Sequence, residues 1–236
     1  MGIEHAIKLT KAINLIVGGY GSGKSEVAVN LARVLAEQRQ SAEEKIAIVD
    51  LDIVNPYFRS REANKVLEQL GVEAINPKGA SFHADLPIIV PEVKGIIQNN
   101  QGTVILDVGG DDVGARVLSS FHTAFGLDNY DMFLVLNANR PFSVDVKSTL
   151  KLMNEIETSS RLKFTGIISN THLMDDTSME NMLDGLTLAH DVSSATGLPV
   201  VFVCATSEFV NQFTRKNIET PLLELKRMLL KPWEIS

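Results

Sequence analysis

The sequence predicts a three-layer α/β/α fold with a mostly parallel central sheet of about seven strands. Three observations lead to this fold class. Short β-branched runs alternate with longer stretches of helical spacing, most of the runs are apolar throughout, and a glycine-rich turn joins the first run to the first helical stretch. Continuous apolar runs are typical of strands that helices cover on both faces. The pattern therefore indicates βα units on one buried sheet.

The predicted strands are short runs rich in Val, Ile and Leu, separated by 21 to 29 residues. They cover Ala12 to Val17, Ile46 to Asp50, Val72 to Asn76, Thr103 to Asp107, Met132 to Leu136, Phe164 to Ser169 and Pro199 to Cys204. No repeat and no Ser/Gly-rich linker divides them, so we expect one domain over residues 1–236.

The predicted helices lie between these strands and after the last one. They cover Lys24 to Gln40, Ser60 to Leu70, Asp85 to Ile97, Asp112 to Ala124, Val144 to Ser159, Met179 to Ala195 and Pro221 to Leu230. In the first, Val27, Leu31 and Val34 share one stripe. Pro91 should kink or delay the third.

Composition excludes several classes of protein. With 236 residues, 44% hydrophobic and 22% charged, the chain can bury a sizeable core, which excludes disordered, collagen-like and disulfide-scaffold proteins. A formal charge of −7 and 6% aromatic residues argue against a nucleic-acid partner. Cys204 is the only cysteine, the first residues carry charges unlike a signal peptide, and no apolar run approaches the roughly 20 residues of a membrane span. We therefore expect a cytoplasmic protein.

The strongest motif is a phosphate-binding loop (P-loop) between the first strand and the first helix. It consists of Gly18, Gly19, Tyr20, Gly21, Ser22, Gly23, Lys24 and Ser25, and satisfies G-x-x-x-x-G-K-[ST]. The glycines allow the backbone N–H groups to wrap around phosphates. Lys24 is expected to reach the β- and γ-phosphates and Ser25 to bind Mg²⁺, with the adjoining Glu26 included in the nucleotide-binding segment. An ordinary glycine-rich turn would not explain the Lys-Ser pair.

Acidic residues follow two other predicted strands. Asp107 ends Thr103 to Asp107 and opens a D-x-x-G pattern with Gly110, which indicates the acid on the magnesium side and a glycine that senses the γ-phosphate. Asp50 and Asp52 end the second strand, where carboxylates point into the ligand crevice of an α/β sheet. The alternative is that these acids only solvate turns. We expect Ser25, Asp52 and Asp107 to bind the metal.

These three segments resemble those of the MinD/ParA-like branch of P-loop ATPases, which also includes the nitrogenase iron protein and dethiobiotin synthetase. The resemblance covers about residues 12–205. It implies that Lys24 and Asp52 are catalytic, with Asp52 positioning the lytic water. It also implies that an Asn after a late strand reads adenine, a role that falls on Asn170, with Asn137 bordering the same crevice; both could instead be loop residues with internal hydrogen bonds.

Two features of the sequence bear on the nucleotide base and on the oligomeric state. Asn170 is followed by Thr171, His172 and Leu173, so the guanine motif N-K-x-D is absent and ATP is the expected nucleotide. The resembling family has a second lysine after the first loop glycine, where this chain has Gly19, so a nucleotide-dependent homodimer stays open without being implied. Arg59, Arg61 and Arg116 could supply the missing cation or lie on the surface.

Other residues suggest structural roles. The five histidines have no spacing of a zinc site. Cys204 lies in an apolar strand and is expected in the core. The predicted last helix, Pro221 to Leu230, is basic and amphipathic and could contact a membrane, but packing against the sheet is favoured.

We therefore expect a Mg²⁺-dependent ATPase whose loops after Asp52 and Asp107 switch on hydrolysis and act on an unidentified protein partner. A small-molecule kinase or ATP-dependent ligase is the alternative, with substrate near Tyr57 to Arg61 or Phe82 to Asp85. A nucleotide-binding module with negligible turnover is a third.

Overall fold

The structure is a computed structural model that describes residues 7–39, 44–51, 61–75, 91, 93–97, 102–109, 112–125, 129–216 and 218–229. Its centre is an eight-stranded sheet with the order β3-β2-β4-β1-β5-β6-β7-β8, and every neighbouring pair is parallel. The strands are β1 (Ile13–Val17), β2 (Ile46–Leu51), β3 (Val72–Ile75), β4 (Thr103–Val108), β5 (Tyr130–Leu136), β6 (Gly166–Ser169), β7 (Val200–Thr206) and β8 (Leu222–Leu225). The predicted fold class is confirmed.

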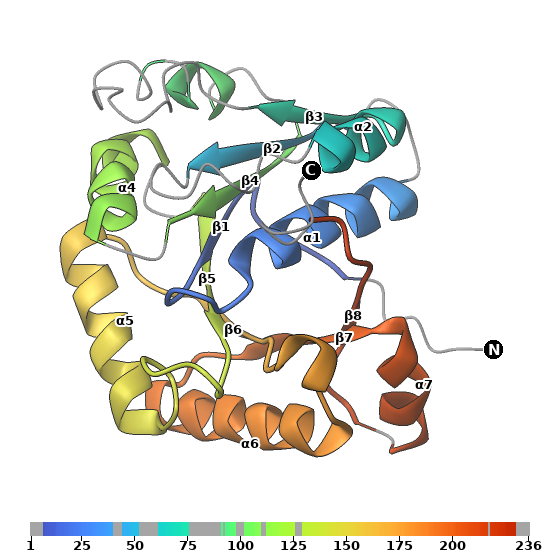
Figure 1. Cartoon of the computed structure of the whole chain (residues 1–236). Helices are drawn as coiled ribbons and strands as arrows, with labels where there is room; N and C mark the ends of the chain where they lie inside the picture. Colours follow the sequence, from blue (N-terminus) through green and yellow to red (C-terminus); the bar gives the residue numbers. More distant parts are fainter. Residues whose placement is uncertain are drawn as a thin grey trace.

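Helices cover both faces of this sheet (Figure 1). They are α1 (Lys24–Gln38), α2 (Arg61–Gln69), α4 (Asp112–Phe125), α5 (Val146–Ser160), α6 (Met179–Thr196) and α7 (Ser207–Arg215), with a short 3-10 turn η2 (Met174–Asp176). Residues 91 and 93–97 are also helical, which agrees with the late part of the helix predicted from Asp85 to Ile97.

The alternating side chains of β1 explain the two helical layers. Ile13, Leu15 and Val17 belong to one buried cluster, which contains residues of α4, α5 and α6. Ile16 belongs to a second cluster, which contains residues of α1 and Leu67 of α2. Burying both faces of the strand removes its apolar surface from water, the main favourable term in folding.

The chain order places the ligand crevice beside β1. From β1 the chain runs through α1 to β2 on one side of the sheet, whereas from β5 it runs to β6 on the other. In open α/β sheets the ligand binds at the carboxyl ends of the strands where the order reverses in this way. The loop after β1 lies at that point.

The prediction of a helix over Pro221 to Leu230 is wrong. Residues Leu222–Leu225 form β8, which pairs with β7, and the described residues after it, 226–229, have no helix. Leu223 is fully buried in the core, and the N–H of Val203 donates to the carbonyl of Pro221 at 2.8 Å. Pairing with a strand edge supplies backbone hydrogen bonds and burial that an isolated amphipathic helix lacks. The predicted membrane-contacting helix is therefore not formed by the described part of this segment.

The sequence reading also missed α7. Its signal was present, because Phe209 and Phe213 are spaced by four residues and both are buried against β7 and α6. Among the described residues, no helix combines the length and hydropathy that a membrane crossing requires.

Candidate nucleotide-binding site

The P-loop of residues 18–25 connects β1 to α1. Gly21 and Gly23 have φ values of 73° and 86°, in the left-handed region that L-residues with side chains seldom adopt. A Cβ on Gly18 would lie 2.5 Å from the carbonyl oxygen of Val135 in β5, so this position has no room for a side chain. The loop therefore needs these glycines for its turn and for its close approach to β5.

Lys24 and Ser25 open helix α1 and are both buried. The Lys24 Nζ donates to the carbonyl oxygen of Gly19 at 3.2 Å, which bends the side chain back over the loop. A cation held above a ring of backbone N–H groups at a helix N-terminus can bind a polyphosphate. The predicted roles of Lys24 and Ser25 thus have a suitable geometry.

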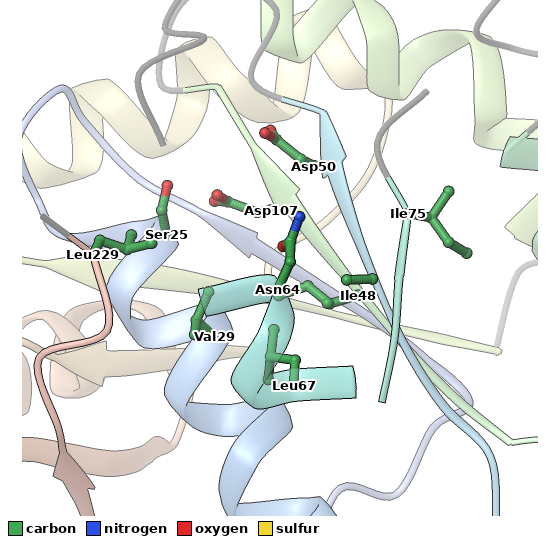
Figure 2. A pocket seen from close by; sticks show the side chains of 10 residues that line it. Ser25, Val29, Ile48, Asp50, Asn64, Leu67, Ile75, Asp107 and Leu229 are labelled. Atoms are coloured by element: carbon green, nitrogen blue, oxygen red, sulfur yellow. The ribbon is translucent and has the colours of Figure 1, made fainter. Parts of the chain in front are cut away.

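The acids on the adjacent strands approach Ser25 across the crevice. Asp50 of β2 and Asp107 of β4 are directly paired in the sheet register, and Asp107 is also paired with Ile16 of β1. Both carboxylates line a pocket with Ser25, and Figure 2 shows the three oxygen-bearing side chains pointing into the same space. Parallel pairing brings Asp50 and Asp107, 57 positions apart in the chain, to one edge of the sheet, and α1 places Ser25 at the same pocket.

Hard oxygen ligands are the ones that Mg²⁺ prefers, and it usually keeps several waters. The Ser25 hydroxyl and the carboxylates of Asp50 and Asp107 supply such a set, so the residues present fit a magnesium ion. No group of three or more His, Cys, Asp or Glu side chains within the described ranges could hold a metal by itself. Asp52 and Gly110, the predicted water-positioning acid and γ-phosphate sensor, lie outside the described residues.

Sequence reasoning did not predict what α2 and the segment after β8 contribute to this pocket. Asn64 from α2 and Leu229 from the segment after β8 also line it, and Figure 2 shows the Asn64 amide directed toward Asp107. Neither lies in a recognisable motif. Only the packing of α2 and the return of the chain to α1 bring them here.

The segment after β8 is held on α1 by side chains that follow the P-loop. The Glu26 carboxylate accepts hydrogen bonds from the N–H groups of Met228 at 2.7 Å and Leu229 at 3.3 Å. The Asn30 amide bonds both the N–H and the carbonyl of Lys226. Burial raises the pKa of Glu26 above its ordinary value. Its side chain therefore anchors this segment, while its predicted contact with the nucleotide stays a prediction.

Asn137 and Asn170 lie on the other side of β1, after β5 and β6. The Asn170 Nδ2 donates to the carbonyl of Ser22 in the P-loop at 2.8 Å. The Asn137 side chain accepts from the N–H of Asn139 at 3.0 Å and donates to the carbonyl of His172 at 3.3 Å. Both amides thus fasten loops to one another, as the alternative of internally hydrogen-bonded loop residues described; adenine recognition stays a prediction.

The remaining candidates lie on the surface, in the core or outside the described residues. Arg59 and the side chain of Arg61 lie outside the described part, and Arg116 is exposed on α4. Cys204 is buried in β7, and burial raises the pKa of its thiol, which agrees with the predicted core role.

No family model and no curated protein matches the chain. Solved structures do. Chloroplast FtsY from Physcomitrella patens has a TM-score of 0.54 and 18% identity over 85% of this chain and 60% of its own. FtsY from Thermotoga maritima has a TM-score of 0.54 and 20% identity over 84% of this chain and 65% of its own. The signal recognition particle 54 kDa protein from Aeropyrum pernix, in complex with GDP, has a TM-score of 0.53 and 21% identity over 84% of this chain and 42% of its own.

The chain has the P-loop NTPase fold. It spans less than two thirds of each of these three structures. At such identities the likeness concerns the fold, and the activities of those proteins are not carried over by it.

Proposed function

We propose that this protein is a Mg²⁺-dependent nucleoside triphosphatase that uses ATP. The observation that carries the proposal is the convergence of Ser25, which follows Lys24 at the start of α1, with the carboxylates of Asp50 and Asp107 at one edge of the sheet. Catalysis of phosphoryl transfer consists mostly of positioning and electrostatic stabilisation, which these groups can supply. The resemblance of the sequence to the MinD/ParA-like branch of P-loop ATPases supports ATP as the nucleotide.

In the proposed reaction the P-loop and Lys24 bind the phosphates. Ser25 and Asp107 would hold magnesium, and Asp52 would bind the ion directly or through a water. Asp52 orients a water whose oxygen attacks the γ-phosphorus; the bond to the β-phosphate oxygen breaks, and ADP and phosphate leave. Gly110 and the segment after Asp52 are the proposed switches for a protein partner. We propose a cytoplasmic location and a single domain, and assign no role to nucleic acid.

The choice of base has support in the loop after β6. Thr171 stands where a guanine motif has lysine, and its buried hydroxyl accepts the N–H of Ala138 at 3.0 Å. Leu173, at the position of that motif's acid, is aliphatic and cannot accept hydrogen bonds from guanine. One structural neighbour was solved with GDP, so GTP is the necessary comparison in any assay.

The test is phosphate release from ATP and from GTP by the purified chain with magnesium. We expect ATP turnover that Lys24→Ala abolishes, while Lys216→Ala, at an exposed position after α7, leaves it unchanged. Asp52→Ala should retain ATP binding and lose hydrolysis. Equal turnover in the wild type and both site variants would refute the mechanism, and faster GTP turnover would refute the choice of base. Phosphate transfer to an added metabolite in place of water would favour the kinase or ligase alternative.

A further inference from the structure

Arg140, in the loop between β5 and α5, lies directly against the P-loop. Its Nε donates to the carbonyl oxygen of Gly21 at 2.9 Å. A Cβ on Gly21 would lie 3.1 Å from that Nε and 3.3 Å from Cζ, so the guanidinium group packs on the glycine itself. The P-loop has one lysine, Lys24, and Arg140 brings a second cation to it from 119 residues further along the chain.

The loop that carries Arg140 is fixed by its own hydrogen bonds. The N–H of Arg140 donates to the carbonyl of Asn137 at 3.1 Å, and the Ser143 hydroxyl donates to the same carbonyl at 2.7 Å. Asn137 is fully buried and bonds the loop after β6. The guanidinium is therefore held in place before any ligand binds, which lowers the entropic cost of binding.

His172 completes this side of the P-loop without adding charge. A Cβ on Gly23 would lie 3.2 Å from its Nε2, and its Nδ1 accepts the N–H of Met174 at 3.4 Å. Burial, with the nearby charge of Arg140, lowers the pKa of His172 to about 4. The ring is therefore neutral at pH 7, with its proton assigned to the Nε2 that faces the P-loop. Arg140 therefore supplies the positive charge on this side of the P-loop.

The two sides of the P-loop differ in chemistry. The acids Asp50 and Asp107 belong to β2 and β4, on one side of β1, whereas Arg140 and His172 follow β5 and β6, on the other. A nucleoside triphosphate is linear, and its metal-bound phosphates belong beside the acids. Its nucleoside end then extends over the side where Arg140 lies.

We propose that Arg140 is a positioning and specificity-determining residue that holds the P-loop at Gly21 and offers its guanidinium plane to the nucleoside of the bound triphosphate. Arginine suits this role because its planar group can donate to a carbonyl through Nε and still stack on a ring through its face. The inference rests on the proposed function, since it needs a nucleotide on the P-loop.

The experiment compares two ligands that share a phosphate chain. Binding of Mg²⁺-ATP and of Mg²⁺-tripolyphosphate, which has no nucleoside, is measured by titration calorimetry for the wild type, Arg140→Ala, Arg140→Lys and the control Arg215→Ala, exposed at the end of α7. We expect Arg140→Ala to weaken ATP binding by at least about fivefold more than tripolyphosphate binding, the scale of one stacked base. Arg140→Lys should recover tripolyphosphate binding and leave ATP binding weak.

The outcomes separate this inference from the function beneath it. A wild type that binds neither ligand would refute the proposed function. A wild type that binds both, with Arg140→Ala weakening both by the same factor, would reduce Arg140 to a support of the loop and overturn the inference alone. Wild-type ATP affinity in Arg140→Lys would also overturn it, and that variant keeps the test decisive if Arg140→Ala does not fold. Arg215→Ala should bind both ligands as the wild type does.

Discussion

A methyl group added at Gly185 in α6 should displace Thr171, in the loop after β6 that adjoins the candidate site. A Cβ there would lie 2.0 Å from the hydroxyl oxygen of Thr171 and 2.2 Å from its Cβ. Thr171 is buried, and its hydroxyl accepts the N–H of Ala138. For Gly185→Ala, α6 and the loop after β6 must therefore separate by more than an ångström.

Three terms set the expected magnitude. Forcing a methyl group into a packed interior costs about 1 to 3 kcal/mol. Loss of the hydrogen bond between Thr171 and Ala138 costs about 1 kcal/mol more. Alanine in a helix is favoured over glycine by about 1 kcal/mol, which offsets part of this. The net expectation is a free energy of unfolding lower by about 1 to 3 kcal/mol, with Tm lower by about 2 to 4 °C per kcal/mol.

The assay is urea unfolding followed by circular dichroism, with ATP affinity measured in parallel because Thr171 adjoins Asn170 and His172. The matched control is Gly95→Ala, also in a helix, where no described atom lies within 4 Å of the new Cβ. We expect that control to be neutral or slightly stabilising. Adding Thr171→Gly to Gly185→Ala should recover stability relative to the sum of the single changes. Surface substitutions usually change the free energy of unfolding by less than about 0.5 kcal/mol. A change no larger than this in Gly185→Ala would show that the contact is not tight.

The remaining predictions concern one carboxyl, one helix cap and one thiol. Burial raises the pKa of Glu26 above its ordinary 4.5, so the free energy of unfolding should fall as pH rises from about 4.5 through the raised pKa. In urea titrations at stepped pH, Glu26→Gln should not show this fall, and the same pH dependence in the variant and the wild type would contradict the prediction. Ser178 accepts the N–H of Asn181 in a capping box at the start of α6, so Ser178→Ala should lower the free energy of unfolding by about 1 kcal/mol in thermal melts, whereas an unchanged melt would show that the cap is dispensable. Burial raises the pKa of the Cys204 thiol, so it should react with a disulfide reagent in urea and resist it in buffer; equal rates would place it at the surface.

Local pattern was enough where the structure depends on neighbours in the sequence. The strand of Ile13–Val17, the glycine loop and the helix from Lys24 were predicted because apolar continuity, positive-φ glycines and helical spacing are local properties. β8 was not, because the same leucines fit a helix by spacing and a strand by pairing. Pairing with the edge of β7 makes this segment a strand, and the local sequence does not specify which strand edge is available for pairing.

The sequence by itself determined the P-loop chemistry: a lysine and a serine at a helix N-terminus, with aspartates at the ends of two other strands, are chemical facts of composition and spacing. The tertiary structure alone decided which distant groups join them. It pairs Arg140 with Gly21 across 119 residues, Asn170 with Ser22 across 148, and Met228 with Glu26 across 202. Contacts at such separations come from strand order and helix packing, which no local periodicity specifies.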